Sequence, residues 1–341
     1  MTDASSTNSP KMTGIDRLRA AAKGEAVDRT PISFWQHFPT VDQSPQTLTE
    51  ALLEFQKRYR LDLVKLMPSG MYSVIDYGAV TSPPDPVSGA RGLASGPIDR
   101  PESFASLPQA DPSQGSLAAE LEVIRGVRAG VPATTPVLET LFSPLTMAAK
   151  LSGLSALQLA EVGGAALHVA LARFAEDTVR YARECLKVGV DGFFFATQWA
   201  TKGALSAAAG IEFGAEYDLR VLEQLRPTSD LLMLHLHGPD PLFELSAQYP
   251  VDWVNWEDGE TPPSLGEASG LTDRGLAGGF ARTQAWLTGD PGRAIEHMQT
   301  SLSATGGRRF MFAPGCVLPQ NTDEGVLLTL REAVEELTPN G

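Results

Sequence analysis

Two histidines and one cysteine have the residue types and spacing of a metal site. His235 and His237 stand two residues apart in an apolar run, so on a β-strand both imidazoles would point to the same side. Cys316 follows another apolar run and directly precedes residues 321–324, which have the composition of a helix start. Two imidazoles and one thiolate suit zinc better than magnesium or calcium, and three protein ligands leave one position open to a substrate or water. Each residue alone is more often structural, so the zinc prediction depends on a fold that brings them together.

Other polar and aromatic side chains stand at or near the ends of further apolar runs. Glu139 and Glu257 are each candidates for a fourth ligand, for a group that orients a ligating histidine, or for an acid/base catalyst. The candidate substrate-binding residues are Trp35, His37, Phe142, Gln198, Trp199, Asn255 and Arg282. Cys185, His168 and His297 fall in helical patterns, and we assign them no functional role.

Eight short apolar runs would position these side chains. They cover residues 32–38, 63–67, 136–141, 192–197, 231–237, 253–256, 276–281 and 309–312. Helical patterns lie between them, the clearest at 47–59, 117–127 and 165–188. This alternation predicts an α/β fold with parallel strands joined by crossover helices, and eight repeats predict a single (β/α)8 TIM barrel whose strand ends share one mouth. An open, doubly wound sheet is the alternative.

The predicted domain organisation is simple. Residues 1–12 are expected to form a disordered leader, and residues 13–340 a single catalytic barrel. A long insertion at about 71–116 is expected to be an active-site cover, a subunit contact or a solvated decoration.

Composition excludes several classes of function. The 341 residues have a formal net charge of −14, with 27 basic against 41 acidic side chains, so an electrostatic surface for nucleic acid is not expected. No apolar run approaches the roughly 18 to 20 residues that a membrane-spanning helix needs. The N-terminus lacks the apolar core of a secretory signal, and the two cysteines are expected to stay reduced. We therefore expect a cytoplasmic protein that does not bind membranes.

Five short segments occur in a characteristic order along the chain: Arg29-Thr30-Pro31, Phe142-Ser143-Pro144-Leu145-Thr146, Val190-Asp191-Gly192, His235-Leu236-His237-Gly238 and Ala313-Pro314-Gly315-Cys316. Together they resemble the uroporphyrinogen decarboxylase superfamily, over about residues 13–337. The superfamily includes decarboxylases and zinc- and corrinoid-dependent methyltransferases. True decarboxylases have an arginine-rich segment after the first strand and an aspartate after the second. This chain has residues 34–39 (Phe-Trp-Gln-His-Phe-Pro) and 67–72 (Met-Pro-Ser-Gly-Met-Tyr) there, so the substrate carboxylates of uroporphyrinogen would lack their partners.

The chain is more similar to the methyltransferase branch, which carries His-x-Cys in the fifth strand and a cysteine after the eighth. His235, His237 and Cys316 occupy those positions, and His237 replaces the first cysteine. One thiolate with two neutral imidazoles leaves the zinc site about one positive charge, whereas two thiolates would neutralise it. A stronger Lewis acid favours a methoxylated substrate over a thiol, unless Glu257 also binds the metal.

The resemblance implies a zinc-dependent methyltransferase that moves a methyl group between a small substrate, methoxylated or a thiol, and a corrinoid (cobalamin) on a partner protein. It also implies a homodimer. One alternative is a metal-free decarboxylase or lyase that uses Glu139, Gln198 or Arg282 on a non-porphyrin substrate. The other is a non-catalytic barrel that only binds a corrinoid protein.

Overall fold

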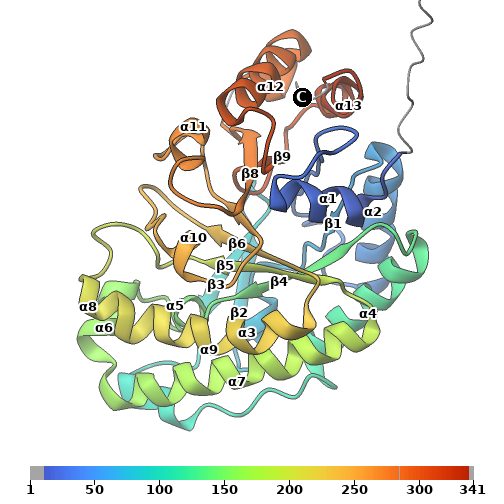
Figure 1. Ribbon diagram of the computed structural model, residues 1–341. Helices are drawn as coiled ribbons and strands as arrows, with labels where there is room; N and C mark the ends of the chain where they lie inside the picture. Colours follow the sequence, from blue (N-terminus) through green and yellow to red (C-terminus); the bar gives the residue numbers. More distant parts are fainter. Residues whose placement is uncertain (1–10, 284, 338–341) are drawn as a thin grey trace, which may run out of the picture.

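In the computed structural model, a seven-stranded parallel sheet forms the centre of the molecule (Figure 1). The structure describes residues 11–283 and 285–337. The strands are β1 Val64–Lys65, β4 Val137–Phe142, β5 Gly192–Thr197, β6 Leu231–Leu236, β7 Trp253–Asn255, β8 Gly275–Phe280 and β9 Phe310–Pro314. Their order in the sheet, β1-β4-β5-β6-β7-β8-β9, follows the sequence throughout. A doubly wound sheet reverses its strand order, so that alternative is wrong.

The segment around Ile32 lies between the two edges of the curled sheet. Ile32 forms a parallel bridge with Phe312 of β9, and its carbonyl accepts a hydrogen bond of 3.0 Å from the amide of Asp62, just before β1. The expected first strand at 32–38 is therefore an extended segment with a single bridge. The α/β class and the parallel sheet are confirmed, and among the described residues this sheet has seven strands where eight were expected.

A buried ionic cluster fixes this N-terminal segment. The carboxylate of Asp62 accepts hydrogen bonds from Arg17 at 2.5 Å and from Arg29 at 2.6 Å and 2.9 Å, and it also accepts from the Ile32 amide at 2.9 Å. Asp62 is 4% exposed, so its charge requires these donors. Removing one donor would leave a buried charge under-satisfied and loosen the segment that contacts both sheet edges.

Helices pack against the outside of the sheet (Figure 1). They are α1 Gly14–Lys23, α2 Pro45–Tyr59, α3 Tyr72–Ile75, α4 Gly115–Gly130, α5 Pro144–Ser152, α6 Ala156–Val162, α7 Gly164–Val188, α8 Ala207–Ala209, the π-helical η2 Gly210–Ala215, α9 Glu216–Leu225, α10 Leu245–Gln248, α11 Leu265–Ala268, α12 Pro291–Thr305 and α13 Glu324–Ala333, with short 3-10 turns η1 Pro101–Ser106, η3 Arg226–Thr228 and η4 Ala285–Thr288. The longest, α7, buries Leu167, Leu171, Phe174 and Thr178 at helical spacing and ends at Gly189, whose φ of 112° favours glycine.

The strand register sorts side chains between the interior of the curled sheet and the helices. Thr140 lies opposite Phe194, and Ala196 lies opposite His235 on the next strand. Side chains two apart on a strand share a face, so the same inner face continues to Phe142. This register brings polar groups from several strands to one end of the sheet.

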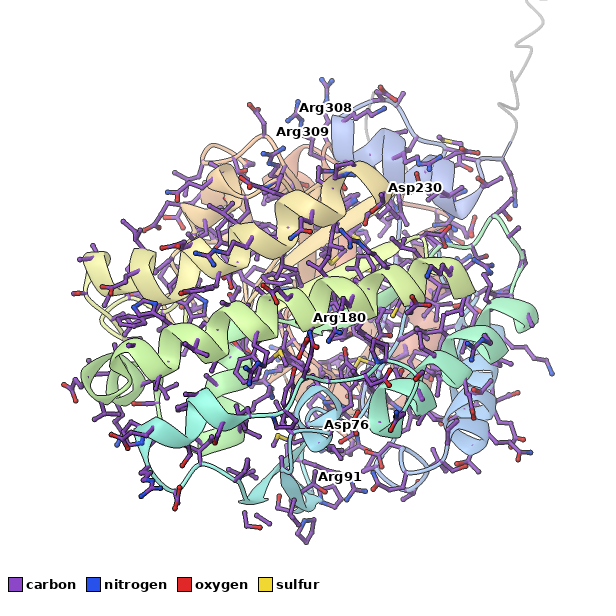
Figure 2. The ribbon with its side chains drawn as sticks, turned by 90° about the horizontal axis from the view of Figure 1, so that it is seen from below. Asp76, Arg91, Arg180, Asp230, Arg308 and Arg309 are labelled. Atoms are coloured by element: carbon purple, nitrogen blue, oxygen red, sulfur yellow. The ribbon has the colours of Figure 1, made fainter. Side chains whose placement is uncertain are left out.

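The long insertion contains an antiparallel hairpin of β2 Val80–Pro84 and β3 Arg91–Ser95. Asp76, at the end of α3, accepts hydrogen bonds from the amides of Ser116 and Leu117 and so caps α4 (Figure 2). Both ends of the insertion are thereby fixed to each other. None of the helices in the described part of the chain has the length and apolar character needed to cross a membrane.

Candidate metal and substrate site

His235, His237 and Cys316 meet at the carboxyl end of the sheet. Their potential ligand atoms all lie within 4.8 Å of one another, and Cys316 Sγ is 3.6 Å from His237 Nδ1. A tetrahedral zinc site separates its ligand atoms by roughly 3.3 to 3.8 Å, as follows from zinc–nitrogen and zinc–sulfur bond lengths. The Cys316–His237 pair already has that separation, and the other two pairs lie within 4.8 Å.

Backbone geometry explains how Cys316 reaches the two histidines. His235 lies near the end of β6, and the chain turns at Gly238, whose φ is 99°. The loop after β9 passes so close to β7 that a Cβ on Gly315 would lie 2.8 Å from the carbonyl oxygen of Trp256. Glycine at position 315 therefore permits the close approach that places Cys316 at the site.

Asn255 fixes the tautomer of His235. The Asn255 amide nitrogen donates to the carbonyls of Ala277 at 2.8 Å and Pro314 at 3.0 Å, so its oxygen is the atom that faces His235. His235 Nδ1 lies 2.6 Å from that oxygen and must donate the hydrogen bond. The other ring nitrogen, Nε2, then carries the lone pair that a metal ion requires.

Burial keeps both imidazoles neutral at neutral pH. Burial and the neighbouring His237 lower the pKa of His235 well below its usual value. Burial, with positive charges on Arg282 and Lys150, lowers the pKa of His237 to about 4. Burial also raises the pKa of the Cys316 thiol. Neutral imidazoles bind a metal without losing a proton, so the donor set fits zinc.

The three residues open into a cavity of about 300 Å³. Its lining combines aromatic and cationic side chains, with the Lys65 ammonium 4.2 Å from the centre of the Phe194 ring and the Lys150 ammonium 4.4 Å from the centre of the Phe142 ring. The predicted site residues Trp35, His37, Phe142, Gln198 and Arg282 line it together with the three candidate ligands.

The other predicted site residues lie outside the cavity lining. Glu257 forms an ion pair of 2.8 Å with Arg282 and is not in the metal-binding group. Glu139 is on the opposite face of β4 from Thr140, is fully buried and accepts a 3.3 Å hydrogen bond from Tyr181 of α7. Trp199 is 2% exposed and donates to Asp218 of α9 at 3.2 Å. Asn255 supports His235 from beneath and is fully buried.

Sequence reasoning missed two lysines that line the cavity. Lys65 ends the short strand β1, and Lys150 is in α5, about two turns beyond the Ser143 cap. The signal for Lys65 was present, because a lone lysine inside the apolar run 63–67 is unusual for a buried strand. Lys150 carried no comparable signal, since a lysine in the last turn of a helix is ordinary.

The hairpin of the insertion covers part of the cavity. Ser88, Ala90 and Arg91, which is labelled in Figure 2, line the cavity. Arg91 forms a 3.0 Å ion pair with Asp42. Gln320, in the loop that carries Cys316, donates its backbone amide to the Val87 carbonyl at 2.8 Å. The tip of the hairpin is therefore attached to the loop that provides the cysteine.

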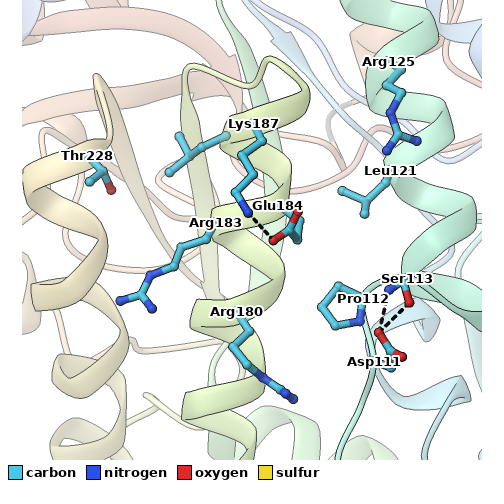
Figure 3. A pocket seen from close by; sticks show the side chains of 11 residues that line it. Asp111, Pro112, Ser113, Leu121, Arg125, Arg180, Arg183, Glu184, Lys187 and Thr228 are labelled. Atoms are coloured by element: carbon cyan, nitrogen blue, oxygen red, sulfur yellow. Dashed lines mark hydrogen bonds and ion pairs between the residues drawn. The ribbon is translucent and has the colours of Figure 1, made fainter.

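A larger groove of about 800 Å³ lies on the flank between α4 and α7 (Figure 3). Its charged residues include Arg125 and Arg183, and Lys187 forms an ion pair of 2.6 Å with Glu184. It contains no histidine or cysteine. The cavity at the strand ends, with its converging ligand groups, is therefore the candidate functional site.

The curled parallel sheet, with a possible metal site at the carboxyl ends of its strands, places the protein in the TIM-barrel-like α/β class. The sequence profile of the uroporphyrinogen decarboxylase (URO-D) family matches residues 13–337. The chain therefore belongs to this family, and the resemblance seen in the sequence is confirmed. No curated protein sequence matched it.

Two solved structures have a similar fold. A methyltransferase from Methanosarcina mazei superimposes with a TM-score of 0.81 at 19% identity, covering 96% of this chain and 99% of that one. A B12-independent methionine synthase from Shewanella sp. W3-18-1 superimposes with a TM-score of 0.57 at 13% identity, covering 91% and 93%. At these identities the likeness establishes the TIM-like fold.

Proposed function

We propose that the protein is a zinc-dependent methyltransferase that moves a methyl group between a small substrate and a corrinoid on a partner protein. The observation that carries the proposal is the convergence of His235, His237 and Cys316 within 4.8 Å, with His235 held in the metal-binding tautomer. The methyltransferase with the same fold supports the assignment to this reaction class.

The three residues would hold zinc through two neutral imidazoles and one thiolate. Zinc there would supply a Lewis acid that polarises the oxygen or sulfur carrying the methyl group, and the corrinoid would accept or donate that group. Arg282 engages Glu257 at 2.8 Å and so keeps this carboxylate out of the ligand group. The metal site then retains about one positive charge, which favours a methoxylated substrate over a thiol.

Elemental analysis of the purified chain tests the metal site. We expect about one zinc per chain, lost in His237→Ala and in Cys316→Ala. His168→Ala and Cys185→Ala serve as matched controls, because His168 bonds to Tyr217 of α9 and Cys185 is buried in α7, both away from the site. Circular dichroism establishes that every variant is folded.

Methyl transfer is then measured with corrinoid proteins and methoxylated or thiol substrates. A folded parent that neither contains nor takes up zinc would overturn the proposal. A metal-free decarboxylase or lyase would then be the better hypothesis, with Gln198 and Arg282 in the cavity and Glu139 outside it.

A further inference from the structure

The cavity wall is positively charged in a chain that is strongly acidic overall. Lys65, Arg91, Lys150 and Arg282 line it, and no aspartate or glutamate is among its described lining residues. The whole chain has 41 acidic and 27 basic side chains. The excess of cations in this one place therefore requires an explanation.

The two arginines already have carboxylate partners. Arg91 pairs with Asp42 at 3.0 Å, and Arg282 pairs with Glu257 at 2.8 Å. Their charges are balanced by protein groups that stand behind the lining. They do not call for a ligand.

The two lysines have no such partners. Lys65 is 5% exposed, and its ammonium donates hydrogen bonds to the hydroxyl of Thr140 at 3.0 Å and the sulfur of Met67 at 2.9 Å. Lys150 is partly buried, and its ammonium lies 4.4 Å from the centre of the Phe142 ring. No ion pair joins either lysine to a carboxylate within residues 11–283 and 285–337. A buried ammonium without a counter-ion is unfavourable, and burial lowers the pKa of Lys65 to about 7 and of Lys150 to about 8.

The two ammonium groups face one region of the cavity. Both line the same cavity, and Lys65 bonds to Thr140 whereas Lys150 lies against Phe142, two residues further along the same face of β4. Lys65 also lies 4.2 Å from the centre of the Phe194 ring, and this ring stacks on His235 at 5.1 Å. An anionic group held by the lysines would therefore lie beside the candidate metal ligands.

We infer that Lys65 and Lys150 bind the carboxylate of a small aromatic acid. Trp35, Phe142 and Phe194 form aromatic walls for its ring, and a volume of about 300 Å³ fits one ring with few substituents. An ammonium–carboxylate contact supplies the carboxylate ion pair that neither lysine has within residues 11–283 and 285–337. The inference rests on the proposed function in one respect, since the methylated substrate would be a methoxybenzoate-like acid.

Calorimetric binding of benzoate and the three methoxybenzoates, each compared with its neutral amide, tests this inference. We expect at least one acid to bind at least tenfold more tightly than its amide, because charge-assisted hydrogen bonds are about twice as strong as neutral ones. Lys65→Met and Lys150→Met should each weaken binding of the acid about tenfold and leave binding of the amide unchanged. Lys57→Met, on the exposed face of α2, is the matched control.

Each titration is run on chelator-treated and on zinc-supplied protein, with folding checked by circular dichroism. Acids that do not bind, that bind no better than their amides, or that bind unchanged to both lysine variants would overturn the inference. Acid binding by a protein that takes up no zinc would uphold the anion site and overturn the proposed methyltransferase. Zinc uptake without acid binding would uphold the metal site of the proposed methyltransferase and overturn the anion site.

Discussion

The Nδ1 atom of His235 lies 2.6 Å from the side-chain oxygen of Asn255, whose amide nitrogen bonds two backbone carbonyls. This arrangement leaves Asn255 no freedom to reverse its amide, so it dictates which nitrogen of His235 is free. Supporting residues of this kind are usually worth 10- to 100-fold in metal affinity.

Asn255→Ala should therefore weaken zinc binding by about 10- to 100-fold. The ligands themselves remain, but His235 loses the acceptor that fixes its tautomer and ring orientation. Competition with a chelating dye measures the affinity, and Asn321→Ala, at an exposed position, is the control. Unchanged affinity in a folded Asn255→Ala protein would show that the hydrogen bond does not prepare His235 for a metal.

His237→Cys should convert the site to the two-thiolate type. The second thiolate neutralises the metal, so we expect stronger charge-transfer absorption after cobalt substitution and better use of thiol substrates relative to methoxylated ones. Cys316→His is the opposite change and should abolish that absorption. Identical spectra for the parent and His237→Cys would contradict the assignment of position 237 as a ligand.

Asp218 should make stability depend on pH. Burial raises its pKa to about 7 from a usual 3.8, although Tyr249 and Trp199 donate hydrogen bonds to it. The folded state thus binds the proton more tightly than the unfolded state, and this stabilisation is lost as pH rises from about 4 to about 7. Between pH 5 and pH 8 the parent should lose about 2 to 3 kcal/mol of unfolding free energy relative to Asp218→Asn. The loss accumulates over the roughly two pH units between pH 5 and the folded pKa of about 7, where the unfolded chain is already ionised and the folded protein is not.

Urea unfolding of both proteins at the two pH values measures this difference. Other buried carboxyls, such as Asp258, titrate in both proteins and cancel in the comparison. A difference of zero, or of the opposite sign, would show that Asp218 is ionised in the folded protein.

Arg91→Met should loosen the hairpin without unfolding the sheet. The Asp42 side chain is 2% exposed, so loss of Arg91 leaves a buried carboxylate without its partner. We expect amide hydrogen exchange in residues 80–95 to accelerate tenfold or more, with strands β4 to β6 unchanged. Arg58→Met is the control, since Arg58 and Glu324 form an exposed ion pair of small energetic value. Equal exchange in both variants would place the anchor of the hairpin elsewhere.

Sequence reasoning succeeded where strand periodicity governs the outcome. His235 and His237 share a face because their spacing is two, and Cys316 follows a strand that ends at the same edge of the sheet. The same rule should have excluded Glu139, because Thr140 and Phe142 have the parity of the cavity face.

Strand periodicity cannot predict the direction of side chains beyond the end of a strand, and it cannot predict the pairing of very short strands. Trp199 lies two residues past β5 and turns away to Asp218, which nothing in the local sequence indicates. The expected first strand forms a single bridge at Ile32, because the Asp62 cluster, and not a ladder of hydrogen bonds, fixes the segment. Such contacts join residues about thirty positions apart and leave no local pattern.

The hairpin tip is attached to the Cys316 loop through its backbone, so we expect the sequence of the hairpin to vary without moving the candidate metal ligands. Strand β6 and the loops that follow β6 and β9 carry the candidate metal ligands, whereas the hairpin between Ala79 and Gly96 provides a separate wall of the cavity. Because Gln320 contacts this wall through the Val87 backbone carbonyl, which every amino acid possesses, new hairpin sequences can dock in the same way. Under the proposed function, we expect that selection, in nature or in the laboratory, exchanges one substrate for another by changing the sequence of this hairpin while the candidate metal ligands stay constant.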